Sequence, residues 1–105
     1  MDPHPTELRA IDPQALTIAR FQKHVSDKYE ATDRARGTPA TWLWFCEEFG
    51  ELARALARKS DKKNIEEEFA DCIAWLCTLA NFNDVDLAAA IHRKYLSAEA
   101  KDGVK

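Results

Sequence analysis

Two short acidic segments in this chain combine residue types that can hold a metal ion. Residues 47–52 read EEFGEL, and residues 67–72 read EEFADC. Both follow one pattern: two glutamates, a phenylalanine, a small residue, an acid and an apolar residue. Carboxylate oxygens are the ligands that Mg²⁺ and Mn²⁺ prefer in proteins. The repeat therefore indicates divalent-metal chemistry.

The spacing of the acids suits two helices. Glu48 and Glu51 are three positions apart, and so are Glu68 and Asp71. On an α-helix this spacing puts two side chains about 60° apart, on one face. Each pair borders an apolar stripe, formed by Phe45, Phe49, Leu52 and Leu56 in the first segment and by Ile65, Phe69, Cys72 and Leu76 in the second. We therefore expect both pairs at the edge of the core.

Antiparallel pairing of the two helices would bring all four carboxylates to one point. Like charges at close range repel, so such a cluster needs a cation. We predict a Mg²⁺ site, with Mn²⁺ as an alternative, whose ligands are Glu48, Glu51, Glu68 and Asp71. One acid pair alone usually lies on a solvated helix face. Two pairs joined by a short hairpin favour the metal site, and the absence of a Glu-x-x-His motif disfavours a ferritin-like di-iron site.

Helix signals dominate the rest of the chain, and no segment alternates long enough to form a strand. We expect four helices, at about residues 13–31, 39–59, 64–80 and 87–100. Their start signals are Asp12-Pro13, Thr38-Pro39, a capping box of Asn64 with Glu67, and Asp86. Short connections imply antiparallel neighbours. The predicted fold is all-α, a four-helix bundle-like arrangement.

Length and charge restrict the class of protein further. The 105 residues suit a single domain, 1–105, with flexible ends at 1–12 and 102–105. The net charge of −3 gives no footprint for duplex nucleic acid, and no apolar run suits a membrane span or a signal peptide. Cys46, Cys72 and Cys77 are expected as buried, reduced thiols, which fits a cytoplasmic protein.

The two acidic segments resemble a known signature. Glu47-Glu48-x-x-Glu51, sixteen intervening residues and Glu68-x-x-Asp71 look like the E-E-x-x-E…E-x-x-D pattern of the MazG-like, all-α NTP pyrophosphohydrolases. The similarity extends over about residues 18–96. It implies Mg²⁺-dependent cleavage of a (deoxy)nucleoside triphosphate between the α- and β-phosphates, a homodimer or homotetramer with sites completed by a neighbouring subunit, and a role in nucleotide-pool house-cleaning.

The resemblance also implies roles for individual residues. The four predicted ligands match the family's metal ligands, and Glu47 matches its first acid. Lys94 matches a basic residue that contacts phosphate, whereas Ala98 stands where some members have an asparagine.

The chemistry of phosphate cleavage points to further site residues. Glu47 or Glu51 is the expected catalytic base for the attacking water. Arg93, Lys94 and Lys28 are candidates for contacting the outer phosphates. Trp75 and Trp44 lie on the acid side of their helices, either as a stacking wall for the base or as core or interface aromatics. Trp42 is expected in the core, and His24 at a partly exposed surface position.

Two alternatives stay open at this point. A non-catalytic helical interaction module would use the acids as a surface patch. A phosphoribosyl-ATP pyrophosphohydrolase, from the same superfamily, would share the metal site and differ in substrate.

Overall fold

The computed structural model describes residues 8–100, and every regular element in this part of the chain is a helix. The elements are a 3₁₀ turn η1 (Pro13–Ala15), α2 (Ile18–Ala57), α3 (Lys62–Phe82), α4 (Leu87–Ile91) and a π-helical turn η2 (His92–Leu96). The predicted all-α class is confirmed. Within the described residues, no helix is both long and apolar enough to cross a membrane.

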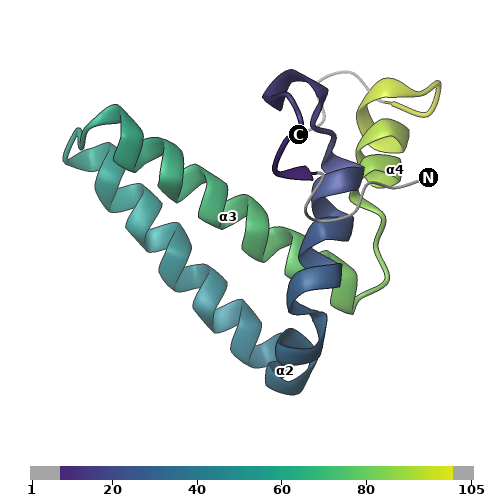
Figure 1. Ribbon diagram of the computed structural model, residues 1–105, viewed down its shortest axis with the longest axis horizontal. Coiled ribbons are helices and arrows are strands. Elements are labelled where there is room, and N and C mark those ends of the chain that lie inside the picture. The colour runs from purple at the N-terminus through teal and green to yellow at the C-terminus, as the bar shows by residue number, and fades with distance from the viewer. Residues whose placement is uncertain (1–7, 101–105) are drawn as a thin grey trace.

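The long helix α2 is two arms that meet at Gly37. This glycine has φ 84° and ψ 167°, outside the helical region and in the part of φ space that glycine enters without strain. Pro39 follows, and its fixed φ and missing N–H suit the first turn of the second arm. The arms point in different directions, and residues 38–57 run antiparallel beside α3 (Figure 1). The predicted first and second helices are thus joined by a kink.

Several predicted helix ends are wrong. Asp12 caps only η1, through a bond from the Gln14 N–H, while Thr17 caps α2 through the Arg20 N–H. Asp61 caps α3 by accepting from the Asn64 N–H at 2.9 Å, so the expected capping box of Asn64 with Glu67 does not start this helix.

The last helix begins where predicted and ends earlier than predicted. Asp86 caps α4, accepting from the Ala89 N–H at 3.1 Å. Helical structure stops at Leu96 instead of residue 100. The Ser97 hydroxyl donates to the Arg93 carbonyl oxygen at 2.7 Å and accepts from the Glu99 N–H at 3.1 Å, which replaces the helical pairing there. The expected flexible ends lie largely outside the described residues.

The core lies between the second arm of α2 and α3. Phe45, Leu52 and Cys72 are buried there, and Trp75 and Leu79 pack against them. Of the other stripe residues, Ile65 is half-buried, and four are exposed: Phe49, Leu56, Phe69 and Leu76. Cys72 and Cys77 are buried, as expected. Two expectations are wrong, because Cys46 is exposed and Trp42 is 53% exposed on the outer face of the hairpin.

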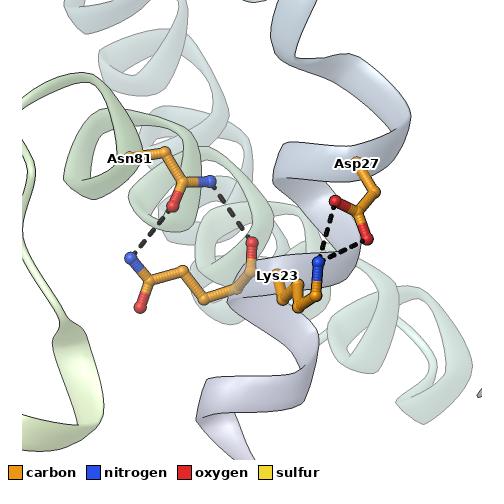
Figure 2. Close-up of polar contacts among 4 residues, drawn as sticks. Lys23, Asp27 and Asn81 are labelled. Carbon is orange, nitrogen blue, oxygen red and sulfur yellow. Dashed lines mark hydrogen bonds and ion pairs between the residues drawn. The ribbon is translucent and has the colours of Figure 1, made fainter. Parts of the chain in front are cut away.

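Gln22 attaches α4 to the first arm of α2. Its Nε2 donates to Asn81 Oδ1 at 3.0 Å and to the Val85 carbonyl oxygen at 2.6 Å, and its Oε1 accepts from the Leu87 N–H at 3.0 Å. Asn81 also donates to the Gln22 carbonyl oxygen. Figure 2 shows Asn81 directed at the arm that carries Lys23 and Asp27. The buried Gln22 amide therefore joins α2, the end of α3 and the start of α4.

We expect Lys59→Gly to stabilise the protein. α2 ends in a Schellman motif, in which the Ser60 N–H donates to the Ala55 carbonyl oxygen and the Lys59 N–H to that of Leu56. Lys59 has φ 52°, a left-handed conformation that costs a residue with a Cβ about 1–2 kcal/mol. Glycine should raise the free energy of unfolding by about 1 kcal/mol, or about 4–8 °C in melting temperature. Lys59→Ala, which loses the charge and keeps the strain, is the control, and equal stability of the two variants would contradict the prediction.

Candidate metal centre

Three of the four predicted ligands meet in the structure. Glu48 on α2 and Glu68 and Asp71 on α3 each offer a carboxylate oxygen, and these three atoms lie within 4.8 Å of one another. The antiparallel pairing of the second arm with α3 brings them together. Glu51 is adjacent, and its charge raises the pKa of both the Glu48 and the Glu68 carboxyl. Glu47 is exposed at the rim. These four acids, Glu48, Glu51, Glu68 and Asp71, form the carboxylate group.

Two oxygens of this group are buried without a partner. Among the described residues, nothing donates a hydrogen bond to Glu48 Oε2 or Glu68 Oε2. A buried polar atom normally has a partner, because leaving it unpaired loses the hydrogen bonds that water would supply. A cation between the two helices would satisfy both oxygens.

The electrostatics of the carboxylate group also favour a bound cation. Burial, followed by the charges of Glu51, Asp71 and Glu68, raises the pKa of the Glu48 carboxyl. Burial, followed by Glu51 and Asp71, raises the pKa of the Glu68 carboxyl. Without a cation, Glu48 and Glu68 are therefore under charge repulsion and favour proton uptake. A divalent cation would relieve the same repulsion.

The donor set fits a hard cation. Every member of the group is a carboxylate, and among residues 8–100 no histidine or cysteine joins it. Cys72 lies close by, but burial and the neighbouring acids raise the pKa of its thiol, and its Sγ donates to the Glu48 carbonyl oxygen at 3.7 Å. An all-oxygen set suits Mg²⁺ or Mn²⁺ and does not suit Zn²⁺.

A cavity of about 310 Å³ lies beside α3, and none of the four acids of the carboxylate group is among the residues that line it. Its lining includes Trp75 and Thr78, which lie one and two helical turns beyond Asp71, and Asp33 and Arg36 from the first arm of α2. The sequence interpretation missed Asp33, Arg36 and Thr78. An Asp and an Arg three positions apart have the signature of an ordinary surface ion pair, and only the kink at Gly37 turns this pair toward α3.

The predicted aromatic residues occupy different environments. Trp75 is half-buried, borders the cavity and has the Arg36 guanidinium 4.8 Å from its ring centre. Trp44 is exposed and stacks on Trp75, with ring centres 6.2 Å apart and planes 16° apart. Trp75 therefore belongs both to the edge of the core and to the cavity wall. His24, half-buried, stacks with Phe21 on the first arm.

The predicted basic residues lie outside this region. Arg93 and Lys94 are exposed in η2, beside α4, and Lys94 lies over the Tyr95 ring. Lys28 is exposed on the first arm, over Tyr29. None of the three lines the cavity or belongs to the carboxylate group of the same subunit.

The sequence of this chain matches the model of one known protein family. Residues 37–97 match the family model described as the MazG nucleotide pyrophosphohydrolase domain. The match covers more than half of the chain and includes both acidic segments. No curated protein matches the chain.

Proposed function

Because the chain belongs to the MazG nucleotide pyrophosphohydrolase family, we propose that it hydrolyses (deoxy)nucleoside triphosphates to a nucleoside monophosphate and pyrophosphate. The family generally depends on a divalent metal, and we propose Mg²⁺. The observation that carries the proposal is the convergence of Glu48, Glu68 and Asp71, with two buried carboxylate oxygens that have no partner among the described residues. An interaction module has no need of such a cluster at the edge of its core.

The proposed roles follow from position. Glu48, Glu68 and Asp71 hold Mg²⁺, with Glu51 completing the set. The bound ion supplies charge neutralisation at the phosphate oxygens and a more acidic water. Glu51, or the exposed Glu47, accepts the proton of the attacking water. The cavity beside Trp75 receives the nucleoside, since Trp75 lies one helical turn beyond Asp71 on the same face of α3.

The exposed apolar surface of the subunit favours self-association. The second arm of α2 and α3 expose a set of large apolar side chains: Trp42, Leu43, Phe49, Leu56, Phe69, Ile73 and Leu76. A groove of about 400 Å³ with an almost wholly apolar lining runs between Trp42 and Phe49, beside Gly50. We propose that a second copy covers this face, so that two helices from each subunit complete a four-helix core. Lys28, Arg93 and Lys94 would then contact outer phosphates in a neighbouring subunit.

We expect light scattering to give at least twice the chain mass of 11.9 kDa, as a homodimer or homotetramer. The reason is that apolar surface of this extent is rarely left open in a monomer. Phe49→Asp, on the exposed face, should shift the protein toward the monomer, and Arg54→Asp, an exposed change on the same arm, should not. A wild-type monomer at micromolar concentration would contradict the assembly.

Product analysis tests the activity. Incubation with canonical and modified nucleoside triphosphates and Mg²⁺ should yield monophosphate and pyrophosphate, and EDTA should stop the reaction. Diphosphate with orthophosphate would place the cleavage elsewhere. Turnover of phosphoribosyl-ATP alone would favour the other superfamily activity, and preference for modified nucleotides would favour house-cleaning. No turnover of any nucleotide would favour the interaction module.

A further inference from the structure

A buried polar network forms part of the cavity wall. Asp33 is 7% exposed and lies between the first arm of α2 and α3. Its Oδ1 accepts from Arg36 Nη2 at 2.7 Å, and its Oδ2 accepts from the Thr78 hydroxyl at 3.2 Å. Arg36 also donates from Nε to the hydroxyl of the fully buried Thr41 at 3.0 Å. Asp33, Arg36 and Thr78 line the cavity, whereas Thr41 does not.

The network stands at a defined distance from the carboxylate group. Thr78 is seven residues after Asp71 on the same helix, which corresponds to about 10 Å along the axis. Trp75 lies between them. A nucleotide whose phosphates lie at the carboxylate group would pass Trp75 with its sugar and the near side of its base. The edge of the base farthest from the phosphates would then be the part that reaches Asp33.

The network presents both kinds of hydrogen-bonding group to that edge. A carboxylate offers about four lone-pair sites, and Arg36 and Thr78 occupy two of those on Asp33. A guanidinium has five N–H donors, and among the described residues Arg36 uses one toward Thr41 and one toward Asp33. An anionic acceptor thus lies beside a cationic donor, and both residues line the cavity.

We propose that Asp33 and Arg36 select the base, and that the preferred base carries an exocyclic amino group beside a ring acceptor. Asp33 accepts from the amino group, and Arg36 donates to the ring nitrogen or carbonyl oxygen next to it. In the same orientation, a keto base such as uracil or hypoxanthine brings its carbonyl oxygen to the carboxylate and its ring N–H to the guanidinium, and both contacts are repulsive. This inference rests on the proposed function and specifies its substrate class.

The same network also has a structural role. Arg36 precedes the kink at Gly37 and Thr41 follows it, so their hydrogen bond spans the kink and fixes the angle between the arms. Thr41→Val therefore serves as a matched control. It removes a hydrogen bond of the network from a residue that does not line the cavity, and it should lower the melting temperature and leave base preference unchanged.

The experiment compares kcat/KM for dCTP against dUTP and for dATP against dITP, with Mg²⁺, in wild type, Asp33→Asn and Thr41→Val. An asparagine keeps an oxygen for Arg36 and lets its amide donate to the Thr78 hydroxyl, while the carboxylate is lost. Wild type should favour the amino member of each pair it turns over by at least about tenfold. Asp33→Asn should lower that ratio at least about tenfold, and Thr41→Val should retain it.

A binding measurement separates this inference from the activity. In EDTA, dCMP should raise the melting temperature of wild type more than dUMP does, and Asp33→Asn should remove the difference. Absence of turnover would overturn the proposed function, whereas this comparison would still test the cavity. If Asp33→Asn does not fold, the wild-type ratios and the two monophosphates decide. Wild-type ratios near or below one, or an unchanged ratio in a folded Asp33→Asn, would overturn the assignment of Asp33 to the base.

Discussion

Glu68→Gln and Glu51→Gln are each expected to reduce pyrophosphate release below about one hundredth of the wild-type rate, and to leave the metal-free protein as stable as wild type or more stable. Glutamine keeps the shape of the side chain and removes one charge from a group whose members repel one another. The substitution therefore relieves repulsion in the metal-free state and removes a ligand from the metal-bound state. Activity and stability should change in opposite directions, which is unusual for a substitution at a partly buried position.

Thermal unfolding with Mg²⁺ and with EDTA measures the expected changes in stability. Mg²⁺ binds the folded cluster and not the unfolded chain, so a hundredfold excess over Kd should add about 2.7 kcal/mol to the wild-type free energy of unfolding. That corresponds to a rise of roughly 10 °C or more for a domain of this size. Both variants should show a smaller rise with Mg²⁺ and no loss of melting temperature in EDTA.

The pH dependence of the metal-free protein follows from the raised pKa values of Glu48 and Glu68. The folded state holds these protons more tightly than the unfolded chain, whose ordinary value is 4.5. Their contribution to stability is therefore complete below that value and is lost as pH rises through the folded pKa. Because Glu68→Gln stays neutral at every pH, its advantage over wild type in EDTA should be small at acid pH and should grow toward neutral pH.

Glu66→Gln is the matched control, since Glu66 is an exposed acid on the same helix and lies outside the carboxylate group. It should change the free energy of unfolding by less than about 0.5 kcal/mol and keep full turnover. If Glu51→Gln and Glu68→Gln behave like this control, with wild-type turnover and the wild-type Mg²⁺ shift, the metal-site assignment is wrong and the proposed mechanism fails with it.

Gln22→Leu is expected to destabilise the protein by about 3 kcal/mol, or more than about 10 °C in melting temperature. Leucine has a similar volume and no polar atoms. It would leave Asn81 Oδ1, the Val85 carbonyl and the Leu87 N–H without their partner, in a contact that is partly buried. Breaking a satisfied buried network costs more than the loss of one hydrogen bond, because each remaining group is left unpaired.

Amide hydrogen exchange shows which part of the protein Gln22→Leu destabilises. Amides of α4 should exchange faster in Gln22→Leu than in wild type, since Gln22 holds the start of that helix. Lys23→Ala is the neighbouring control: its ion pair with Asp27, at 3.2 Å, is exposed (Figure 2) and should contribute less than about 1 kcal/mol. Similar melting temperatures for Gln22→Leu and Lys23→Ala would show that the Gln22 contacts do not anchor α4.

The convergence of Glu48, Glu68 and Asp71 could be predicted from the sequence because it depends on local rules. The spacing of three residues puts each acid pair on one helix face, and a short connection obliges two helices to lie antiparallel. The helical class follows from the same local signals. The N-cap of α3 does not follow from local rules in the same way, because Asp61 and Asn64 both offer acceptable N-cap side chains and only the formed helix selects Asp61.

The tertiary structure alone decided what lies around the carboxylate group. Gly37 could have ended a helix in a loop, and instead it forms a kink that directs Asp33 and Arg36 at α3. The apolar stripes predicted burial for Phe49 and Phe69, yet these side chains remain exposed, because one hairpin has too little surface to cover both of its faces. The contacts of Gln22 with Asn81 and Leu87 join residues about sixty positions apart. No periodicity encodes such pairings, since they depend on the angle at which the arms of α2 meet and on where the chain returns after α3.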